Sequence, residues 1–196
     1  MYSFNEGKKY IQENHKIEFN EVKEIISMVD AEACKVKKSE EETMKGKLLY
    51  APKELNKCFK RNFKKKGWIT GARINVWTEV PEIQTTHKGY REIDALKNKL
   101  GVEVQFGKYS FMVYNVAAKM TIFAKQKIID SGIEVVPMLR LAKEMSSGVS
   151  YFEQMKTDLE MRGVSNIDIP VIVLGVVQNK KVAKTLLSKP KQLSFD

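Results

Sequence analysis

Apolar residues recur at helical spacing in two early segments of the chain. Residues 17–37 predict an amphipathic helix, because the apolar positions fall on one stripe, three or four residues apart. These positions are Val22, Ile25, Ile26, Val29 and Ala33. A second helix is expected over residues 52–67, since Pro52 suits a first helical turn and Gly67 suits a helix end. The apolar face of this second helix consists of Leu55, Cys58, Phe59 and Phe63.

Later segments alternate between apolar and polar side chains or form short β-branched runs, as strands do. In the clearest case Val102, Val104 and Phe106 point to one face, and Glu103 and Gln105 point to the other. Strands are predicted over residues 73–78, 101–106, 133–137 and 170–177, and further helices over residues 110–129 and 151–162. This order of elements predicts an α/β fold in which helices flank a mixed central sheet.

The composition indicates one folded domain, residues 1–196, with a positive surface. Apolar residues make up 43% of the chain, enough for a buried core, so wholesale disorder is excluded. No run of about 18 apolar residues occurs, so a membrane-spanning helix is not expected. The net charge of +10 favours an anionic partner: nucleic acid, an anionic membrane or an acidic protein.

Basic residues gather in two clusters, which serve either as phosphate contacts or simply as solvated faces. The first lysine cluster comprises Lys57, Lys60, Arg61, Lys64, Lys65 and Lys66. The second lysine cluster comprises Lys180, Lys181, Lys184, Lys189 and Lys191. Charge therefore predicts a class of partner but not a function.

The two cysteines and the first residues of the chain favour a cytoplasmic protein. Cys34 and Cys58 have no metal-ligand spacing and are too few for a disulfide framework, so we expect two isolated, buried thiols. Residues 1–16 contain charges and no apolar stretch of signal-peptide length.

Candidate chemistry lies in Asp94 and in the strand that carries Glu103. If Asp94 lies on a neighbouring strand, the two carboxylates can converge across the turn around residues 97–101. Converging carboxylates repel each other unless a cation lies between them, and Mg²⁺ suits such an oxygen site, with the Val104 carbonyl as a possible further ligand. The chemistry that follows is metal-assisted phosphodiester hydrolysis. A strand with one polar face produces the same Glu-x-Gln spacing without any such role, so spacing alone leaves both interpretations open.

This arrangement resembles the nuclease motif written PD…(D/E)xK, with Asp94 as the first acid and Glu103 as the second. Gln105 occupies the lysine position and Ile93 the proline position, and both departures resemble the BglII and BstYI branch of type II restriction endonucleases. Three segments in matching order carry the resemblance, which is closest to the BstYI-like members: DAEAC (30–34), VEVQFGKYSF (102–111) and EMSSGVSY (144–151).

The resemblance implies a restriction-endonuclease-like core that works as a homodimer, with Asp94 and Glu103 as the metal-binding acids. Gln105 would orient a water or a phosphate without adding charge, which leaves charge stabilisation to the metal. Lys108 and Ser147 fall on positions that, in the BstYI-like enzymes, read base edges, and Ser146 and Ser150 are weaker candidates. A solvated lysine is the alternative for Lys108, and a cap for the helix near residue 151 is the alternative for Ser147.

Two further residues are marginal candidates for the site. Asn75 is a possible polar active-site residue, although the similarity around it is loose. Glu32 lies in a well-matched segment, but a solvated position on the helix surface suits it better than the site does.

The resemblance implies a Mg²⁺-dependent type II restriction endonuclease that cuts double-stranded DNA at a short palindrome with a GATC core, such as R-GATC-Y. Two alternatives stay open. One is another metal-dependent nuclease on the same core, acting in repair or on particular DNA structures. The other is a DNA-binding protein without catalysis, which the neutral Gln105 would favour. Discrete bands, a smear or binding without cleavage would distinguish the three.

Overall fold

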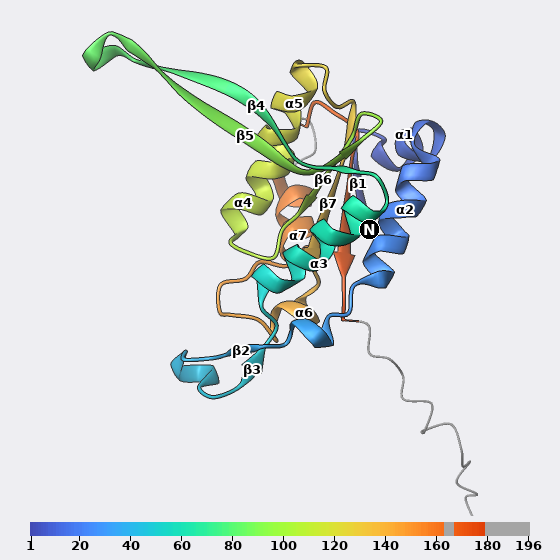
Figure 1. Cartoon of the computed structure of the whole chain (residues 1–196), viewed down its shortest axis with the longest axis vertical. Coiled ribbons are helices and arrows are strands. Elements are labelled where there is room, and N and C mark those ends of the chain that lie inside the picture. The colour runs from blue at the N-terminus through green and yellow to red at the C-terminus, as the bar shows by residue number, and fades with distance from the viewer. Residues whose placement is uncertain (163–166, 179–196) are drawn as a thin grey trace, which may run out of the picture.

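The computed structural model describes residues 1–162 and 167–178, and a six-stranded mixed sheet lies at its centre (Figure 1). The strand order is β1-β8-β7-β6-β5-β4, in which β6, β7 and β8 are parallel and the other neighbours are antiparallel. The strands are β1 (Tyr2–Phe4), β4 (Ile69–Val80), β5 (Thr85–Lys97), β6 (Leu100–Val104), β7 (Ser131–Pro137) and β8 (Val171–Val176). The predicted mixed sheet is therefore confirmed.

Helices cover both faces of this sheet and enclose two apolar cores. On one face, Phe59 and Phe63 pack in one core with Val102 and Val104 of β6. On the other face, Met120 belongs to a second core with side chains of β1, β7 and β8. The first layer contains α1 (Gly7–Asn14), α2 (Lys16–Met28), α3 (Pro52–Lys65) and α6 (Leu139–Ala142). The second layer contains α4 (Tyr109–Tyr114), α5 (Met120–Lys125) and α7 (Phe152–Arg162).

The helix predicted over residues 17–37 is shorter than expected, because α2 ends at Met28. Val29 is extended and the chain continues into a short 3-10 turn, η1 (Glu32–Cys34), where Asp30 Oδ1 accepts the N–H of Ala33 over 3.3 Å. Ala33 is exposed and does not continue the buried stripe. A small antiparallel pair follows, β2 (Lys37–Lys38) and β3 (Leu48–Leu49), with the 3-10 turn η2 (Glu42–Met44) between its strands.

The helix predicted over residues 110–129 is interrupted and ends early. Between α4 and α5 the chain forms a π-turn, η4 (Asn115–Lys119), and α5 ends at Lys125. Lys127 has a φ of 59°, which breaks the helix before Ile129 packs into the second core. The chain is therefore helical over most of the predicted range, but its hydrogen bonds change to the π-helical pattern over Asn115–Lys119.

Strands β4 and β5 form a long hairpin that projects beyond the helical layers (Figure 1). Its far end turns through η3 (Pro81–Ile83), and most of its outer residues are exposed. The predicted strand 73–78 is confirmed as the middle of β4. At the base of this hairpin β5 pairs with β6, and Asp94 lies there on β5.

The expectation of two isolated, buried thiols is wrong. Cys34 is buried, but Cys58 on α3 is only partly buried, and their sulfur atoms lie 3.6 Å apart. Both are free thiols, and burial is the main cause that raises the pKa of Cys34 to about 12. No helix among residues 1–162 and 167–178 has both the length and the apolarity needed to cross a membrane.

Candidate active site

Asp94 and Glu103 come together because a tight turn joins their strands. Ala95 pairs with Val102 and Lys97 with Leu100, so the two acids stand one step further along the same ladder. Asn98 and Lys99 form the connecting loop, and both have positive φ, as a two-residue hairpin requires. The structure thus brings the two predicted acids together.

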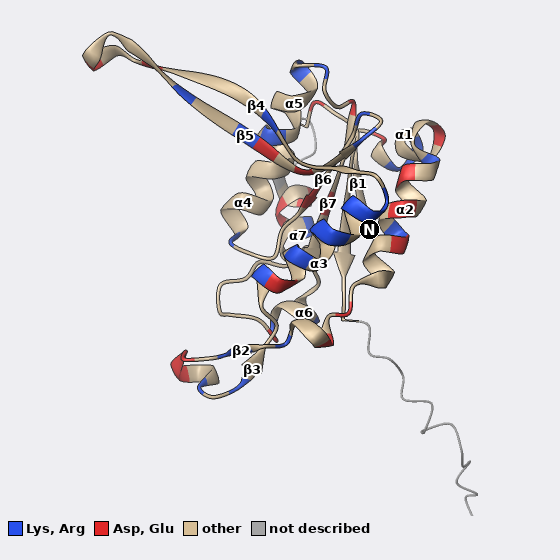
Figure 2. Ribbon diagram, in the orientation of Figure 1, with Lys and Arg blue, Asp and Glu red and all other residues tan. Residues whose placement is uncertain are grey.

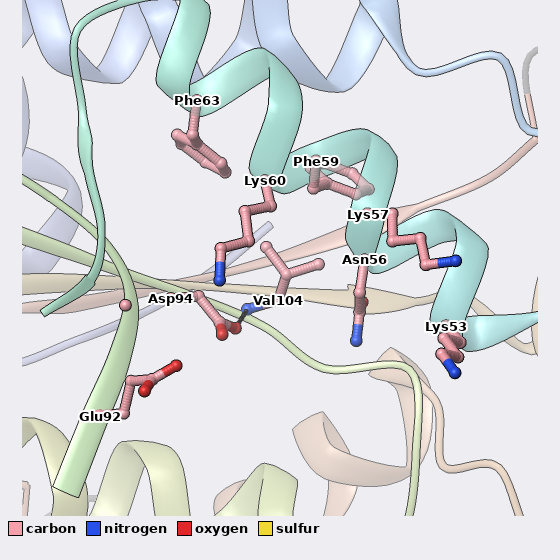
Figure 3. Close-up of a pocket in the computed structure, with 10 residues that line it drawn as sticks. Lys53, Asn56, Lys57, Phe59, Lys60, Phe63, Glu92, Asp94 and Val104 are labelled. Carbon is pink, nitrogen blue, oxygen red and sulfur yellow. Dashed lines mark hydrogen bonds between the residues drawn. The ribbon is translucent and has the colours of Figure 1, made fainter.

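The backbone near Asp94 departs from a regular ladder. Pairing between β4 and β5 passes from Thr70–Ala95 to Ala72–Ile93, and Gly71 stands opposite Asp94 with a φ of +71°. A side chain at that position would be strained, so glycine permits the irregularity. Asp94 Oδ2 accepts the N–H of Val104 over 2.8 Å, which fixes the carboxylate at the end of β6 (Figure 3).

Burial and mutual repulsion raise the pKa values of the acids at this end of the sheet. Burial raises the pKa of Asp94, although the Val104 N–H and the charge of Lys119 act in the opposite direction. Burial and then the charge of Asp94 raise the pKa of Glu103 to about 8. Burial also raises the pKa of Glu134 well above its ordinary value. A carboxylate pair with raised pKa values gains from any cation that binds between its members.

A cavity of about 430 Å³ opens above Asp94, between α3 and the sheet (Figure 3). Protein surrounds most of the Asp94 carboxyl, which raises its pKa, but the side chain opens onto this cavity and meets solvent there, whereas Glu103 is buried behind it. Helix α3 contributes Lys53, Lys57 and Lys60, which are spaced by four and three residues and so share one helix face. Asp94 therefore lies on the floor of this pocket, with Glu103 behind it, and the wall formed by α3 carries several basic residues (Figure 2).

The oxygen atoms present fit a hard divalent cation. Glu103 Oε1 has no well-aligned hydrogen bond from the described residues, although Lys119 Nζ lies 2.9 Å away. Among residues 1–162 and 167–178, no group of three or more His, Cys, Asp or Glu side chains is arranged to hold a metal. Mg²⁺ commonly takes only one or two carboxylates and completes its coordination with water and phosphate oxygens, so the Asp94–Glu103 pair is sufficient.

Gln105 lies just beyond the end of β6, and its side chain lies against Gly107. Its N–H donates to the Val135 carbonyl over 2.9 Å, which extends the pairing with β7. Its side-chain amide lies over Gly107, where a Cβ atom would come within 2.7 Å of Nε2. The predicted role of Gln105 in orienting a water or phosphate stays a prediction.

The predicted base-reading residues lie on two loops that contact each other. Lys108 is exposed immediately before α4, and the Ser150 N–H donates to the Gly107 carbonyl over 3.0 Å. Ser146 accepts a hydrogen bond from Lys37, and the Ser147 N–H donates to Glu41 Oε2 over 2.9 Å. The structure thus places Lys108 and the two serines on adjoining loops.

The remaining candidates lie elsewhere. The Tyr50 hydroxyl donates to Glu32, so this acid belongs to a contact between η1 and the chain before α3. Asn75 is exposed on β4, paired with Tyr90 in the projecting hairpin. Most of the first lysine cluster is exposed on α3, and the second lysine cluster lies outside the described residues.

Three site residues escaped sequence analysis: Asn115, Lys119 and Glu134. Lys119 pairs with Glu103, and Asn115 Nδ2 donates to Glu134 Oε1 over 3.1 Å. A signal was present, since Lys119 and Glu134 are single charges within apolar segments, where an unpaired charge is costly. The pattern could not identify their partners.

Comparison with known proteins agrees with this geometry. The family described as "Restriction endonuclease BglII/BglIII" matches residues 1–176. The structure is similar to restriction endonuclease BglII in complex with a DNA 16-mer, with a TM-score of 0.70 and 21% identity over 92% of this chain and 76% of that one. It is also similar to free BglII, with a TM-score of 0.57 and 18% identity over 92% and 79% of the chains. The search of curated proteins gave no match. The family match over most of the chain shows that this protein belongs to the BglII/BglIII restriction endonuclease family and is a type II site-specific nuclease.

Proposed function

We propose that the protein is a Mg²⁺-dependent, homodimeric endonuclease that cuts double-stranded DNA at a short palindrome with a GATC core. The observation that carries the proposal is the convergence of Asp94 and Glu103 beside a pocket with a lysine-lined wall, onto which Asp94 opens. The similarity to a BglII structure that contains DNA supports a duplex as the substrate.

Each residue of the site has a distinct task in this proposal. Asp94 and Glu103 hold the ion, the Val104 carbonyl adds an oxygen, and the Val104 N–H keeps Asp94 in place. When bound, Mg²⁺ supplies polarisation of the phosphoryl oxygen and a more acidic water. The lysines of α3 hold the DNA backbone across the pocket, which positions the phosphate without reading sequence.

A homodimer accounts for cleavage of both strands. A two-fold symmetric pair presents two identical recognition surfaces to a palindrome and one active site to each strand. Lys108, Ser146 and Ser147 would read base edges from their adjoining loops, and Lys108 follows closely after the strand that carries Glu103.

Digestion of a phage genome with Mg²⁺, followed by sequencing of the fragment ends, tests the proposal. Discrete bands whose ends share a GATC-containing palindrome are the expected result. A smear, or cutting confined to junctions, would instead indicate a repair or structure-specific nuclease.

Light scattering of the protein, free and bound to DNA, measures its oligomeric state. A monomer in both states would contradict the homodimer.

Lysines on α3 are expected to bind DNA phosphates. Replacing Lys57 or Lys60 with alanine should weaken binding to all duplexes alike, because phosphate contacts release counterions regardless of sequence. Each substitution should also reduce the slope of log K against log salt concentration by about 1. Fluorescence anisotropy over a salt series measures both effects. Lys9→Ala on α1, where Lys9 pairs with Glu6, is the matched control. Unchanged slopes in both α3 variants would mean that the duplex does not pass this helix.

Lys108 is expected to read a base. Because lysine can donate to guanine O6 and N7 in the major groove, Lys108→Ala should cost about 1–3 kcal/mol of discrimination against altered sites. Cleavage rates on the mapped site and on its single-base-pair variants give this quantity. Lys127→Ala, an exposed lysine after α5, should leave the preference unchanged. Equal weakening of Lys108→Ala on every sequence would reassign Lys108 to a phosphate contact.

A further inference from the structure

Two buried glutamates lie side by side at the candidate metal site, and one helix supplies a partner for each. Glu103 on β6 and Glu134 on β7 are register partners on adjacent strands, with exposures of 3% and 0%. Lys119 Nζ lies 2.9 Å from Glu103 Oε1, and Asn115 Nδ2 lies 3.1 Å from Glu134 Oε1. The helix thus gives a charged partner to the glutamate beside Asp94 and a neutral partner to the other.

The helix changes its hydrogen bonding where these partners leave it. Asn115 and Lys119 are the first and last residues of the π-turn η4 between α4 and α5. Single turns of π-helix are rare and are frequently found at functional sites. Asn115 is 2% exposed and the Lys119 side chain 15% exposed, so both are directed at the sheet rather than at solvent. The irregular turn therefore coincides with the two residues that reach the glutamates.

Lys119 also joins the two strands that carry the acid pair. Besides its contact with Glu103 on β6, its Nζ donates to the Glu92 carbonyl of β5 over 3.2 Å. Glu92 precedes Asp94 by two residues. Asp94, on the neighbouring strand, acts on the Glu103 carboxyl through its charge. Lys119 therefore contacts Glu103 directly and is anchored to the strand that carries Asp94.

We propose that Lys119 is a positioning residue for divalent cation binding, which holds the Glu103 carboxylate toward Asp94. Lys119 supplies a fixed positive charge from the helix to Glu103. The next polar residue after Glu103, Gln105, is neutral and supplies no such charge. The inference rests on the proposed function, because it concerns the same pair of acids. Partners that orient metal-binding side chains typically change metal affinity or activity by about 10- to 100-fold when they are removed.

Calorimetric titration of the metal-free, full-length protein with Mn²⁺ tests this role without any cleavage assay. Lys119→Met should weaken Mn²⁺ binding by about 10- to 100-fold, because Glu103 loses its fixed orientation. Lys119→Arg keeps the charge and should retain most of the affinity. Lys125→Met, at an exposed lysine of α5, is the matched control and should bind Mn²⁺ as the wild type does.

A Lys119→Met variant whose Mn²⁺ affinity is not lowered would overturn the proposal. If Lys119 only balances charge, its removal relieves repulsion toward the incoming cation, and Lys119→Met would bind Mn²⁺ as tightly as the wild type or more tightly. If circular dichroism shows that Lys119→Met is unfolded, Lys119→Gln carries the same expectation, since its amide can still donate to the Glu92 carbonyl.

A second readout separates this role from the proposed function. Lys119→Met should lower kcat because the cation is bound less tightly. It should leave the affinity for duplex DNA unchanged, because the Lys119 side chain is only 15% exposed and its Nζ contacts Glu103. A wild type that binds Mn²⁺ but cuts no DNA would refute the proposed function, while the comparison of Mn²⁺ affinities would still decide the role of Lys119. A wild type that binds no Mn²⁺ would refute the positioning role as well.

Discussion

Replacing Asp94 with asparagine, or Glu103 with glutamine, should reduce DNA cleavage by about 10³-fold or more and leave duplex binding largely intact. Each change is nearly isosteric and removes one negative charge from the pair that holds the ion. A bound metal typically contributes several kcal/mol to transition-state stabilisation, and each 1.4 kcal/mol or so corresponds to a tenfold change in rate. An asparagine at position 94 can still accept the Val104 N–H, so the local backbone should survive.

Nicking of supercoiled plasmid in Mg²⁺ measures the loss, and gel shifts in Ca²⁺ measure binding separately. Glu79→Gln is the matched control, because Glu79 is an exposed acid on the projecting hairpin. It should cut at the wild-type rate. Normal nicking by either site variant would show that the pair is not the metal site, whatever its geometry.

The parts of the fold that sequence analysis predicted are those set by local rules. Helix α3 was predicted because Pro52 begins it and Gly67, with a φ of +76°, follows its end. Strands β7 and β8 were predicted because continuous β-branched runs are typical of strands buried on both faces. The end of α2 could not be predicted in this way, because Val29 and Ala33 keep the spacing of a helical stripe. In the structure Val29 and Ala31 are both buried, and no helix places residues two apart on one face.

The same division applies to the candidate site. Asp94 and Glu103 lie on strands joined by a two-residue loop, so alternation and a turn were enough to bring them together. Lys119 and Glu134 reach the pair through packing of a helix and of a parallel strand, at separations of 16 and 31 residues from Glu103. No local pattern encodes such contacts. The sequence does show that Lys119 and Glu134 are each a single charge within an apolar segment. Such residues can be tested as contacts of the candidate acids.

Phe63→Ala should lower the free energy of unfolding by about 3–5 kcal/mol, the usual loss when a buried phenylalanine is truncated. Phe63 is 1% exposed, and its ring packs edge-on against Trp68 with centroids 5.1 Å apart. It lies on the face of α3 that contacts the sheet. Denaturation in urea measures the loss. Ile83→Ala at the exposed tip of the hairpin is the control, with an expected change within about 0.5 kcal/mol.

This prediction separates the structural face of α3 from its functional face. Phe63 also borders the cavity above Asp94, so a loss of docking would move the lysines that form the positive wall. If α3 keeps its position below the unfolding transition, Phe63→Ala should retain both the salt dependence of DNA binding and the cleavage rate of the wild type. A loss of less than about 1 kcal/mol would contradict the packing of α3 on the sheet, since surface substitutions alone produce changes that small. The pocket wall would then need another support, because a helix that does not dock cannot hold Lys57 and Lys60 over the carboxylate pair.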